Sequence, residues 1–352
     1  MKKNITFLTL LFIYNNLLAC DFCGCYMGIT PYDNQSSITL MYRYKSYNGY
    51  INSGQQNNLF PQNYRSSIHT IPNFDSKDID IKNFNYRHGS NPTATKKTEV
   101  PQKTQKDYEI YSSAELRAKF YIQKRIEINA IVPFVMNSNR VDDKMEHVKG
   151  VGDITFFAGY HLISKIEEAR FQHRLIIGAG VKLPTGNYYA KNDGNERIDF
   201  LLQSGTGSID YMTYFNYIFA YKKLGFSMNT TYKINGTNYY HEQIDNSITN
   251  YLNVFYKFRQ DKTLKLFPSI QGYYEYTNGV YIDNVYEAGT RTKVLTGGVG
   301  VDFFYKNFSL NTSYQLPIYE NKIGNNLATA GKLMAGVTYN FNQKKYLISS
   351  KN

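Results

Sequence analysis

The feature that most constrains this chain is an alternation of apolar and polar residues that recurs in many separate segments. Residues 153–162 show it clearly, since every second side chain there is apolar or aromatic. These side chains are Ile154, Phe156, Ala158, Tyr160 and Leu162. Successive side chains of a β-strand point to opposite faces of a sheet. One face of such a strand therefore suits lipid and the other suits water.

The segments are joined by connections that alternate between short and long. A short polar connection at 164–170 is followed by a long polar loop at 184–204, and the turns at 123–125 and 305–307 are also short. Strands of about 10 residues in this arrangement are typical of outer membrane barrels. A sheet in hydrocarbon has to close on itself, because an open edge leaves backbone groups unpaired. The sequence therefore predicts an all-β fold, a transmembrane antiparallel up-and-down β-barrel of about 12 strands.

The predicted barrel occupies residues 37–341. Its strands are predicted at 37–44, 107–121, 126–134, 153–162, 174–182, 208–221, 224–233, 251–258, 264–276, 293–304, 308–316 and 333–341. Long loops are predicted at 48–106, 136–149, 184–204, 235–247, 277–290 and 317–332. The first loop is rich in Asn, Gln, Ser and Lys, and we interpret it as a plug in the lumen or as a disordered segment. The last strand ends at Phe341, an aromatic signal for the barrel assembly machinery, and a polar tail at 342–352 follows it.

Composition favours the same class of protein. The chain has 34 Tyr and 22 Phe but no Trp, as expected when lipid-facing aromatic residues are mixed with polar lumen and loop residues. The alternative is a secreted β-sandwich or propeller, which has shorter strands and no regular change between long and short connections. The formal net charge of +12 suits anionic lipid head groups or simply solvated loops. No nucleic-acid-binding motif accompanies this charge.

The first 19 residues have the pattern of an export signal. Lys2 and Lys3 precede an apolar run at 5–18 that is too short to span a membrane as a helix. We therefore predict a signal peptide at 1–19 and localisation in the outer membrane of a Gram-negative bacterium. The residues before Cys20 resemble a lipobox, so lipidation of Cys20 and ordinary cleavage both remain open. The sequence contains no later run of about 18 apolar residues, so it does not predict a helical inner-membrane protein.

All three cysteines lie in the segment 20–36, which is predicted to be periplasmic. Cys20, Cys23 and Cys25 form a C-x-x-C-x-C array. Thiolates in such an array suit Cu(I) or Zn(II). If Cys20 carries lipid, the two remaining thiols are enough for Cu(I) but not for a closed zinc site. The alternatives are a disulfide in an oxidising periplasm, or a lipid anchor with an incidental cysteine pair.

Charged residues of both signs are predicted to point into the lumen. A narrow interior requires such charges to pair or to contact water, so Glu115, Glu127, Asp153, Asp210 and Asp302 are expected to have basic partners. We interpret this network either as purely structural or as the lining of a narrow polar passage. The lumen-lining candidates are Arg43, Glu115, Arg117, Glu127, Asp153, His161, Arg174, Asp210 and Asp302.

A barrel hydrolase is the competing enzymatic hypothesis. It needs a serine, a histidine and an orienting group within hydrogen-bond reach. Asp153 and His161 share a face, but they are eight residues apart, which is about 26 Å along a strand. Ser208 and Asp210 lie near the external end of another strand. We therefore predict no catalytic residue and expect the protein not to be an enzyme.

Four short motifs resemble a known family. They are Gly150-Val151-Gly152-Asp153, Leu183-Pro184-Thr185-Gly186, Leu202-Gln203-Ser204-Gly205-Thr206-Gly207-Ser208-Ile209-Asp210 and Gln315-Leu316-Pro317-Ile318-Tyr319. In this order they resemble the outer membrane transporter-like family associated with phenol meta-pathway degradation. The opening Cys20-Asp21-Phe22-Cys23-Gly24-Cys25 resembles a Bacteroidetes branch of that family. The resemblance implies a β-barrel that passes small, often hydrophobic solutes, and it carries no defined functional residues.

The glycines of these motifs also have a physical explanation. They fall where predicted strands meet external loops, and glycine relieves bending there. A structural role is favoured over ligand contact, and no helix pattern follows that would indicate a phosphate-binding loop.

Together these patterns predict a passive outer membrane channel for small solutes, and the family resemblance implies that these solutes are often hydrophobic or aromatic. Its expected partners are outer membrane lipid, a small-molecule solute and the barrel assembly machinery. The alternative is a metal-handling protein that uses its cysteine segment, with Cu(I) as the one cofactor considered.

Overall fold

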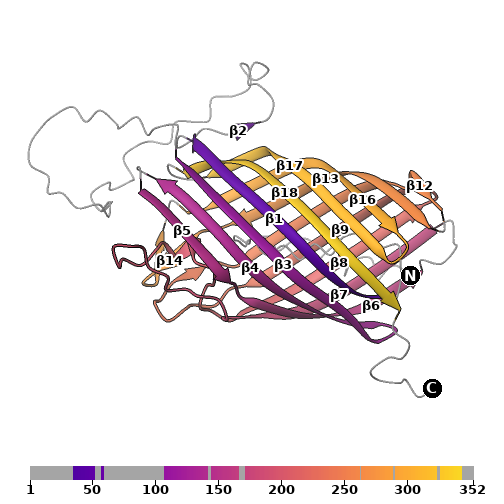
Figure 1. The fold of residues 1–352 in the computed structure, drawn as a ribbon, viewed down its shortest axis with the longest axis horizontal. Coiled ribbons are helices and arrows are strands. Elements are labelled where there is room, and N and C mark those ends of the chain that lie inside the picture. The colour runs from indigo at the N-terminus through magenta and orange to yellow at the C-terminus, as the bar shows by residue number, and fades with distance from the viewer. Residues whose placement is uncertain are drawn as a thin grey trace, which may run out of the picture.

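The barrel is the dominant feature of the computed structural model, which describes residues 35–51, 57–58, 107–141, 144–165, 171–261, 263–287, 290–322 and 326–342. Within these ranges twelve antiparallel strands form one closed barrel (Figure 1). Their order around it is β1, β3, β4, β6, β7, β8, β9, β11, β13, β16, β17 and β18, and β18 pairs back onto β1. The predicted all-β, closed antiparallel barrel is confirmed.

The strand bounds are as follows. The barrel strands are β1 (Gln35–Ile51), β3 (Tyr108–Gln123), β4 (Ile126–Val141), β6 (Ile154–Lys165), β7 (Phe171–Leu183), β8 (Asp210–Tyr221), β9 (Leu224–Ile234), β11 (Ser247–Tyr256), β13 (Leu264–Thr277), β16 (Thr292–Tyr305), β17 (Phe308–Lys322) and β18 (Asn326–Asn342). Shorter strands accompany them: β2 (Asn57–Asn58), β5 (Lys144–Val151), β10 (Gln243–Ile244), β12 (Arg259–Gln260), β14 (Val280–Ile282) and β15 (Val285–Glu287). No helix among the described residues is long and apolar enough to cross a membrane.

Alternation along each strand decides which side chains meet lipid. In β8 the side chains of Asp210 and Met212 are buried, whereas Tyr211 between them is 59% exposed. Large apolar residues stay exposed on the outer surface of distant strands, such as Leu40 at 61% and Val299 at 62%. A barrel that presents an apolar outer belt and a polar interior is suited to hydrocarbon outside and water inside.

The two ends of the barrel differ in their connections. The turn end carries the tight turns after β8 and β16 and the pairing of Gln35 with Asn342. Lys222 and Lys306 in these turns have φ of 51°, the left-handed conformation that two-residue hairpin turns favour. The loop end carries the connection 184–209 between β7 and β8, and the connection between β9 and β11.

Several predicted loops are wrong, because strands continue beyond the apolar belt. Strand β4 reaches Val141 and β5 follows it, so both occupy the predicted loop 136–149. Strands β17 and β18 likewise take up most of the predicted loop 317–332. Outside the bilayer a strand pairs through its backbone without an apolar face, so these extensions lack the pattern on which the prediction depends.

Other predictions fall outside the described residues. These are the signal peptide at 1–19, lipidation of Cys20, the Cys20, Cys23 and Cys25 array, and most of the loop 48–106 and of the tail 342–352. They stay predictions. Within the part of the chain that the structure describes, no group of three or more His, Cys, Asp or Glu side chains could hold a metal ion.

Candidate functional site in the barrel lumen

A buried charge network joins four neighbouring strands at the loop end. Lys182 of β7 lies 3.1 Å from Asp153 and also pairs with Asp210 of β8. Lys233 of β9 lies 3.1 Å from Asp210 on its other side. The strand register produces this arrangement, because Lys182 is the direct cross-strand partner of Asp210. Each charge has an opposite charge beside it, which buried ions require.

Asp153 also holds both ends of the loop 184–209. Its Oδ1 accepts a hydrogen bond from the Gly186 backbone N–H at 2.9 Å. Its Oδ2 accepts from the backbone N–H and the hydroxyl of Thr206, both at 2.9 Å. A carboxylate that accepts several backbone N–H groups fixes the chain around it. One side chain therefore fastens the start and the end of the longest described loop.

The glycines of this loop make the close approach of its two ends feasible. A Cβ atom at Gly205 would lie 2.6 Å from the Gly186 carbonyl carbon and 2.7 Å from Asp153 Oδ1. Gly207 has φ of 72°, and a Cβ there would also collide with the ring of Tyr188. Motifs that are far apart in the sequence thus form one compact structure. Their glycines serve packing and backbone conformation at this point.

The middle of the loop packs over the lumenal face of the barrel wall at the loop end. The 3-10 helix η3 (Phe200–Leu202) places Leu202 in a cluster with Ile198 and with Val148 of β5. Asn137 of β4 donates from Nδ2 to the Leu202 carbonyl at 3.0 Å. These contacts lie on the inward-facing side of β4 and β5, so the loop covers part of this side.

A second clamp ties this loop to the connection between β9 and β11. The Arg197 guanidinium donates to both carboxylate oxygens of Glu242, at 2.5 and 2.7 Å. The central carbon of the guanidinium, Cζ, also lies 4.3 Å from the centre of the Tyr240 ring. The hydrogen bonds that Arg197 donates to the Glu242 carboxylate raise the pKa of Arg197. Two external connections are thereby joined by a bidentate ion pair.

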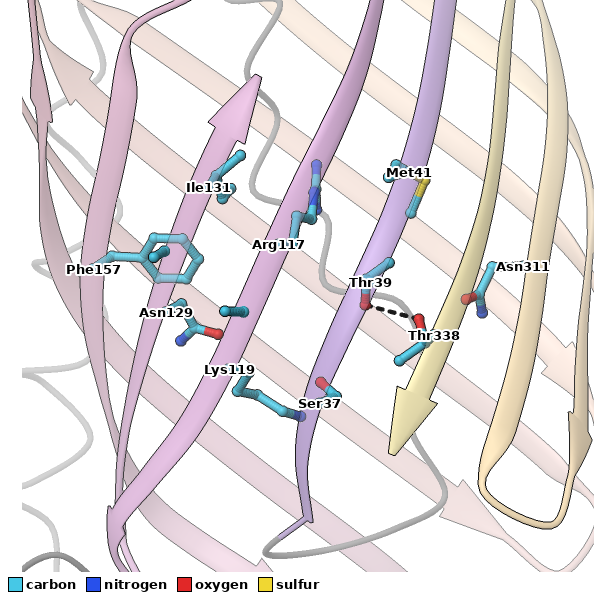
Figure 2. Close-up of a pocket in the computed structure, with 12 residues that line it drawn as sticks. Ser37, Thr39, Met41, Arg117, Lys119, Asn129, Ile131, Phe157, Asn311 and Thr338 are labelled. Carbon is cyan, nitrogen blue, oxygen red and sulfur yellow. Dashed lines mark hydrogen bonds between the residues drawn. The ribbon is translucent and has the colours of Figure 1, made fainter. Parts of the chain in front are cut away.

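A cavity of about 70 Å³ lies on the lumenal side of β1, β3, β4 and β6, and Asn311 of β17 and Thr338 of β18 also line it (Figure 2). Arg117 and Lys119 of β3 supply its positive charge. Met41, Ile131 and Phe157 supply apolar surface. Its volume is enough for several water molecules. The cavity therefore offers a small solute both charged and apolar contacts.

Further ion pairs lie on the lumenal face of the barrel wall. Glu115 accepts a hydrogen bond from Arg117 at 2.8 Å and lies 3.3 Å from Arg43. Glu127 of β4 lies 3.0 Å from His161 of β6. Glu275 of β13 lies between Lys45 and Lys332, at 3.4 and 3.1 Å, a grouping that the sequence alone does not indicate. Arg174 is buried in the same interior, at 4% exposure.

An apolar cluster occupies the turn end of the lumen, and sequence reasoning missed it. Its members are Ile218, Ala220, Phe255, Phe267 and Phe304. The Phe267 ring lies 5.9 Å from that of Phe255 and 5.3 Å from that of Phe304. The signal was present, because these residues occupy inward positions of the alternation close to the short turns.

Asp302 contradicts the expectation that every lumenal carboxylate has a basic partner. Its side chain is 3% exposed, and its direct cross-strand neighbours are Phe267 and Asn311. Asn311 donates to Oδ1, while Oδ2 has no hydrogen-bond partner among the described residues. The expectation is wrong here because neither neighbouring position carries a basic side chain. The other four carboxylates do have basic partners.

The described residues do not assemble a hydrolase site from the candidates considered. Ser208 donates to Asp210 at 2.8 Å, but Asp210 is paired with two lysines. His161 is paired with Glu127 instead. Serine, histidine and carboxylate are therefore distributed over separate networks, and a nucleophile with its base is not formed.

Comparison with known proteins agrees with this architecture. Residues 89–327 match the family described as "Putative MetA-pathway of phenol degradation". The chain belongs to this family. The predicted resemblance is thereby confirmed for the barrel. No protein of curated function matches the sequence.

Solved structures with a similar fold are outer membrane barrels. The COG4313 outer membrane channel from Pseudomonas putida F1 has a TM-score of 0.59 at 15% identity, and the match covers 90% of this chain and 98% of that chain. The beta domain of the Bordetella autotransporter BrkA has a TM-score of 0.45 at 9% identity, covering 88% and 100% of the two chains. At 15% identity, the likeness to the Pseudomonas channel concerns the fold alone.

Proposed function

We propose that this protein is a passive outer membrane channel for small solutes. The observation that carries the proposal is a closed barrel with an apolar outer belt and an interior lined by charged and polar side chains. Polar groups inside a membrane barrel are expected where water or solute passes. The similar fold of a protein described as an outer membrane channel adds support.

The interior favours small solutes that combine an apolar body with a polar group. The cavity beside Arg117 and Lys119 is only about 70 Å³ and is partly lined by Met41 and Phe157. The aromatic cluster at the turn end offers further apolar contact. These surfaces can contact both the apolar body and the polar group of such a solute as it passes along the lumen wall.

The alternatives receive less support. The cysteine array lies outside the described residues, and nothing in the barrel supports a copper site. The candidate serine and histidine lie in separate networks, so a hydrolase is less supported than a channel. The outward aromatic residues Tyr339 and Phe341 near the end of β18, whose rings are 6.2 Å apart, support insertion by the barrel assembly machinery.

The proposal is tested with purified, refolded protein in planar bilayers and in liposomes. We expect small, stable conductance steps, together with uptake of small aromatic alcohols or acids into liposomes. Heat-modifiable migration in gel electrophoresis and circular dichroism show whether the barrel is folded in each preparation. A folded barrel without conductance and without uptake contradicts the proposal.

A further inference from the structure

Asp302 differs from the other predicted lumenal carboxylates because it has no basic partner among the described residues. Glu115, Glu127, Asp153 and Asp210 each have a basic neighbour at 3.3 Å or less. Asp302 lies on β16 with an aromatic residue on one side and an amide on the other. Within the described part of the chain its Oδ2 has no hydrogen-bond donor. This group thus differs from the four other lumenal carboxylates that were expected to have basic partners.

A small cavity adjoins this carboxylate. Its volume is about 10 Å³, and Asp302, Gln271, Asn311 and Ser313 line its polar side. A space of that size accommodates one water-sized group. The Ser313 hydroxyl is a second buried polar atom there without a partner among the described residues. Both residues thus line the same small space, and each has one buried oxygen without a hydrogen-bond partner among the described residues.

The chemistry of these oxygens selects the ligand. An unpaired carboxylate in a buried position is costly, and an opposite charge removes most of that cost. Carboxylate and hydroxyl oxygens are hard ligands that suit ions without soft character. The lining residues of the small cavity include no basic side chain. A positive group supplied from outside the chain satisfies both oxygens.

We propose that Asp302 and Ser313 form a lumenal binding site for one compact cation. A monovalent metal ion and the ammonium group of a primary amine share the required charge and size. A quaternary ammonium group is too large for the space. The larger cavity shares Met41 and Asn311 with the small one, so the site adjoins the open part of the lumen.

Cation binding is measured on the folded protein in detergent, at constant ionic strength. Rubidium, methylammonium and choline chlorides are compared for their effect on the urea midpoint of unfolding. We expect rubidium or methylammonium, but not choline, to raise the midpoint in a saturable manner. Rubidium gives an anomalous diffraction signal, which we expect in contact with Asp302 Oδ2. A larger effect of rubidium would indicate a metal ion as the preferred ligand, and a larger effect of methylammonium would indicate an amine.

The variant Asp302→Asn keeps the size and the contact with Asn311 but removes the charge. We expect its apparent affinity for the cation to fall about tenfold or more. Asp193→Asn, in the exposed part of the loop 184–209, is the matched control and should bind as the wild type does. Ser313→Ala removes one ligand and should weaken binding less. It also provides the test if Asp302→Asn fails to fold.

Three results overturn the proposal: equal effects of choline and rubidium, unchanged binding in Asp302→Asn, or only a water molecule at Oδ2 in the diffraction density. A further consequence rests on the proposed channel function. If the barrel conducts, Asp302→Asn should lower the permeability of rubidium relative to chloride, measured as a shift in reversal potential. A barrel that binds cations without conducting would contradict the channel and leave the site intact.

Discussion

The loop end and the turn end of the lumen are narrowed by different forces. At the loop end, Asp153, Lys182 and Asp210 hold a loop through ion pairs and backbone hydrogen bonds. At the turn end, Phe255, Phe267 and Phe304 fill the interior by apolar packing. Charge networks depend on pairing and on salt, whereas apolar packing depends on shape and area. The lumen therefore combines a constriction that ions can weaken with one that they cannot.

Removal of the Asp153 carboxylate should have the largest effect. Asp153→Ala leaves the N–H groups of Gly186 and Thr206 without their acceptor and leaves Lys182 with one partner fewer. We expect a loss of about 3–5 kcal/mol in the free energy of unfolding. We also expect faster hydrogen exchange of the two amides and a larger conductance. Asp193→Ala in the same loop is the control, and equal behaviour of the two variants would contradict the anchoring role.

A cavity created at the turn end should lower the free energy of unfolding somewhat less than Asp153→Ala does. Phe267→Ala removes the ring that contacts both Phe255 and Phe304, and we expect a loss of about 3 kcal/mol in unfolding free energy. The change in conductance should be the same at low and high salt, unlike that of Asp153→Ala. The control is Phe215→Ala, on the lipid face of β8. A strong salt dependence for Phe267→Ala would remove the contrast between the two ends.

In the wall between the two ends, the effect of a substitution should depend on whether it lies on the outer or the lumenal face of the strand. Leu40 is 61% exposed on the outer surface, while Thr39 lines the lumenal cavity. Leu40→Arg should cost about 2 kcal/mol through contact with hydrocarbon, measured by refolding into bilayers. Thr39→Arg should insert more readily and reduce conductance. Equal insertion defects in both variants would show that the assigned faces are incorrect.

The clamp between external connections should have the smallest effect. Arg197→Gln breaks the ion pair with Glu242, which is partly exposed to solvent, so we expect a loss of under about 1 kcal/mol. The loss should shrink at high salt. Arg259→Gln, in the more exposed pair with Asp261 near the turn end, is the control. A loss at Arg197 that is independent of salt would indicate packing on Tyr240 as the main contribution.

Strand faces could be predicted from the sequence because alternation is a local property. Glu127 and Asp210 point inward for the same reason that Tyr211 points outward. Pairing between distant strands could not be predicted in this way. Lys45 meets Glu275 across 230 residues, and that contact depends on the closure of the barrel and on its stagger. The isolation of Asp302 was missed for the same reason, since its neighbours are set by the register.

The site at the loop end shows an intermediate case. The glycine motifs around Asp153, Gly186 and Gly205 could be found as motifs, but their convergence on one carboxylate could not. The strands β5 and β10 escaped prediction because β5 pairs with the extension of β4 and β10 pairs with β14 in a separate small sheet. Local patterns therefore identify the lipid-facing part of the chain, while the parts in water need the three-dimensional structure.

The seam between β1 and β18 has a consequence for the time course of folding. It pairs Gln35 with Asn342 and Ile51 with Asn326, so it joins the first and last described strands of the chain. A chain that ends before β18 would present two open sheet edges, and such edges recruit other chains. Aggregation during synthesis and export is therefore limited by the arrival of the final 17-residue strand. Truncation of β18 should therefore impair folding much more than the loss of its few contacts with solute would suggest.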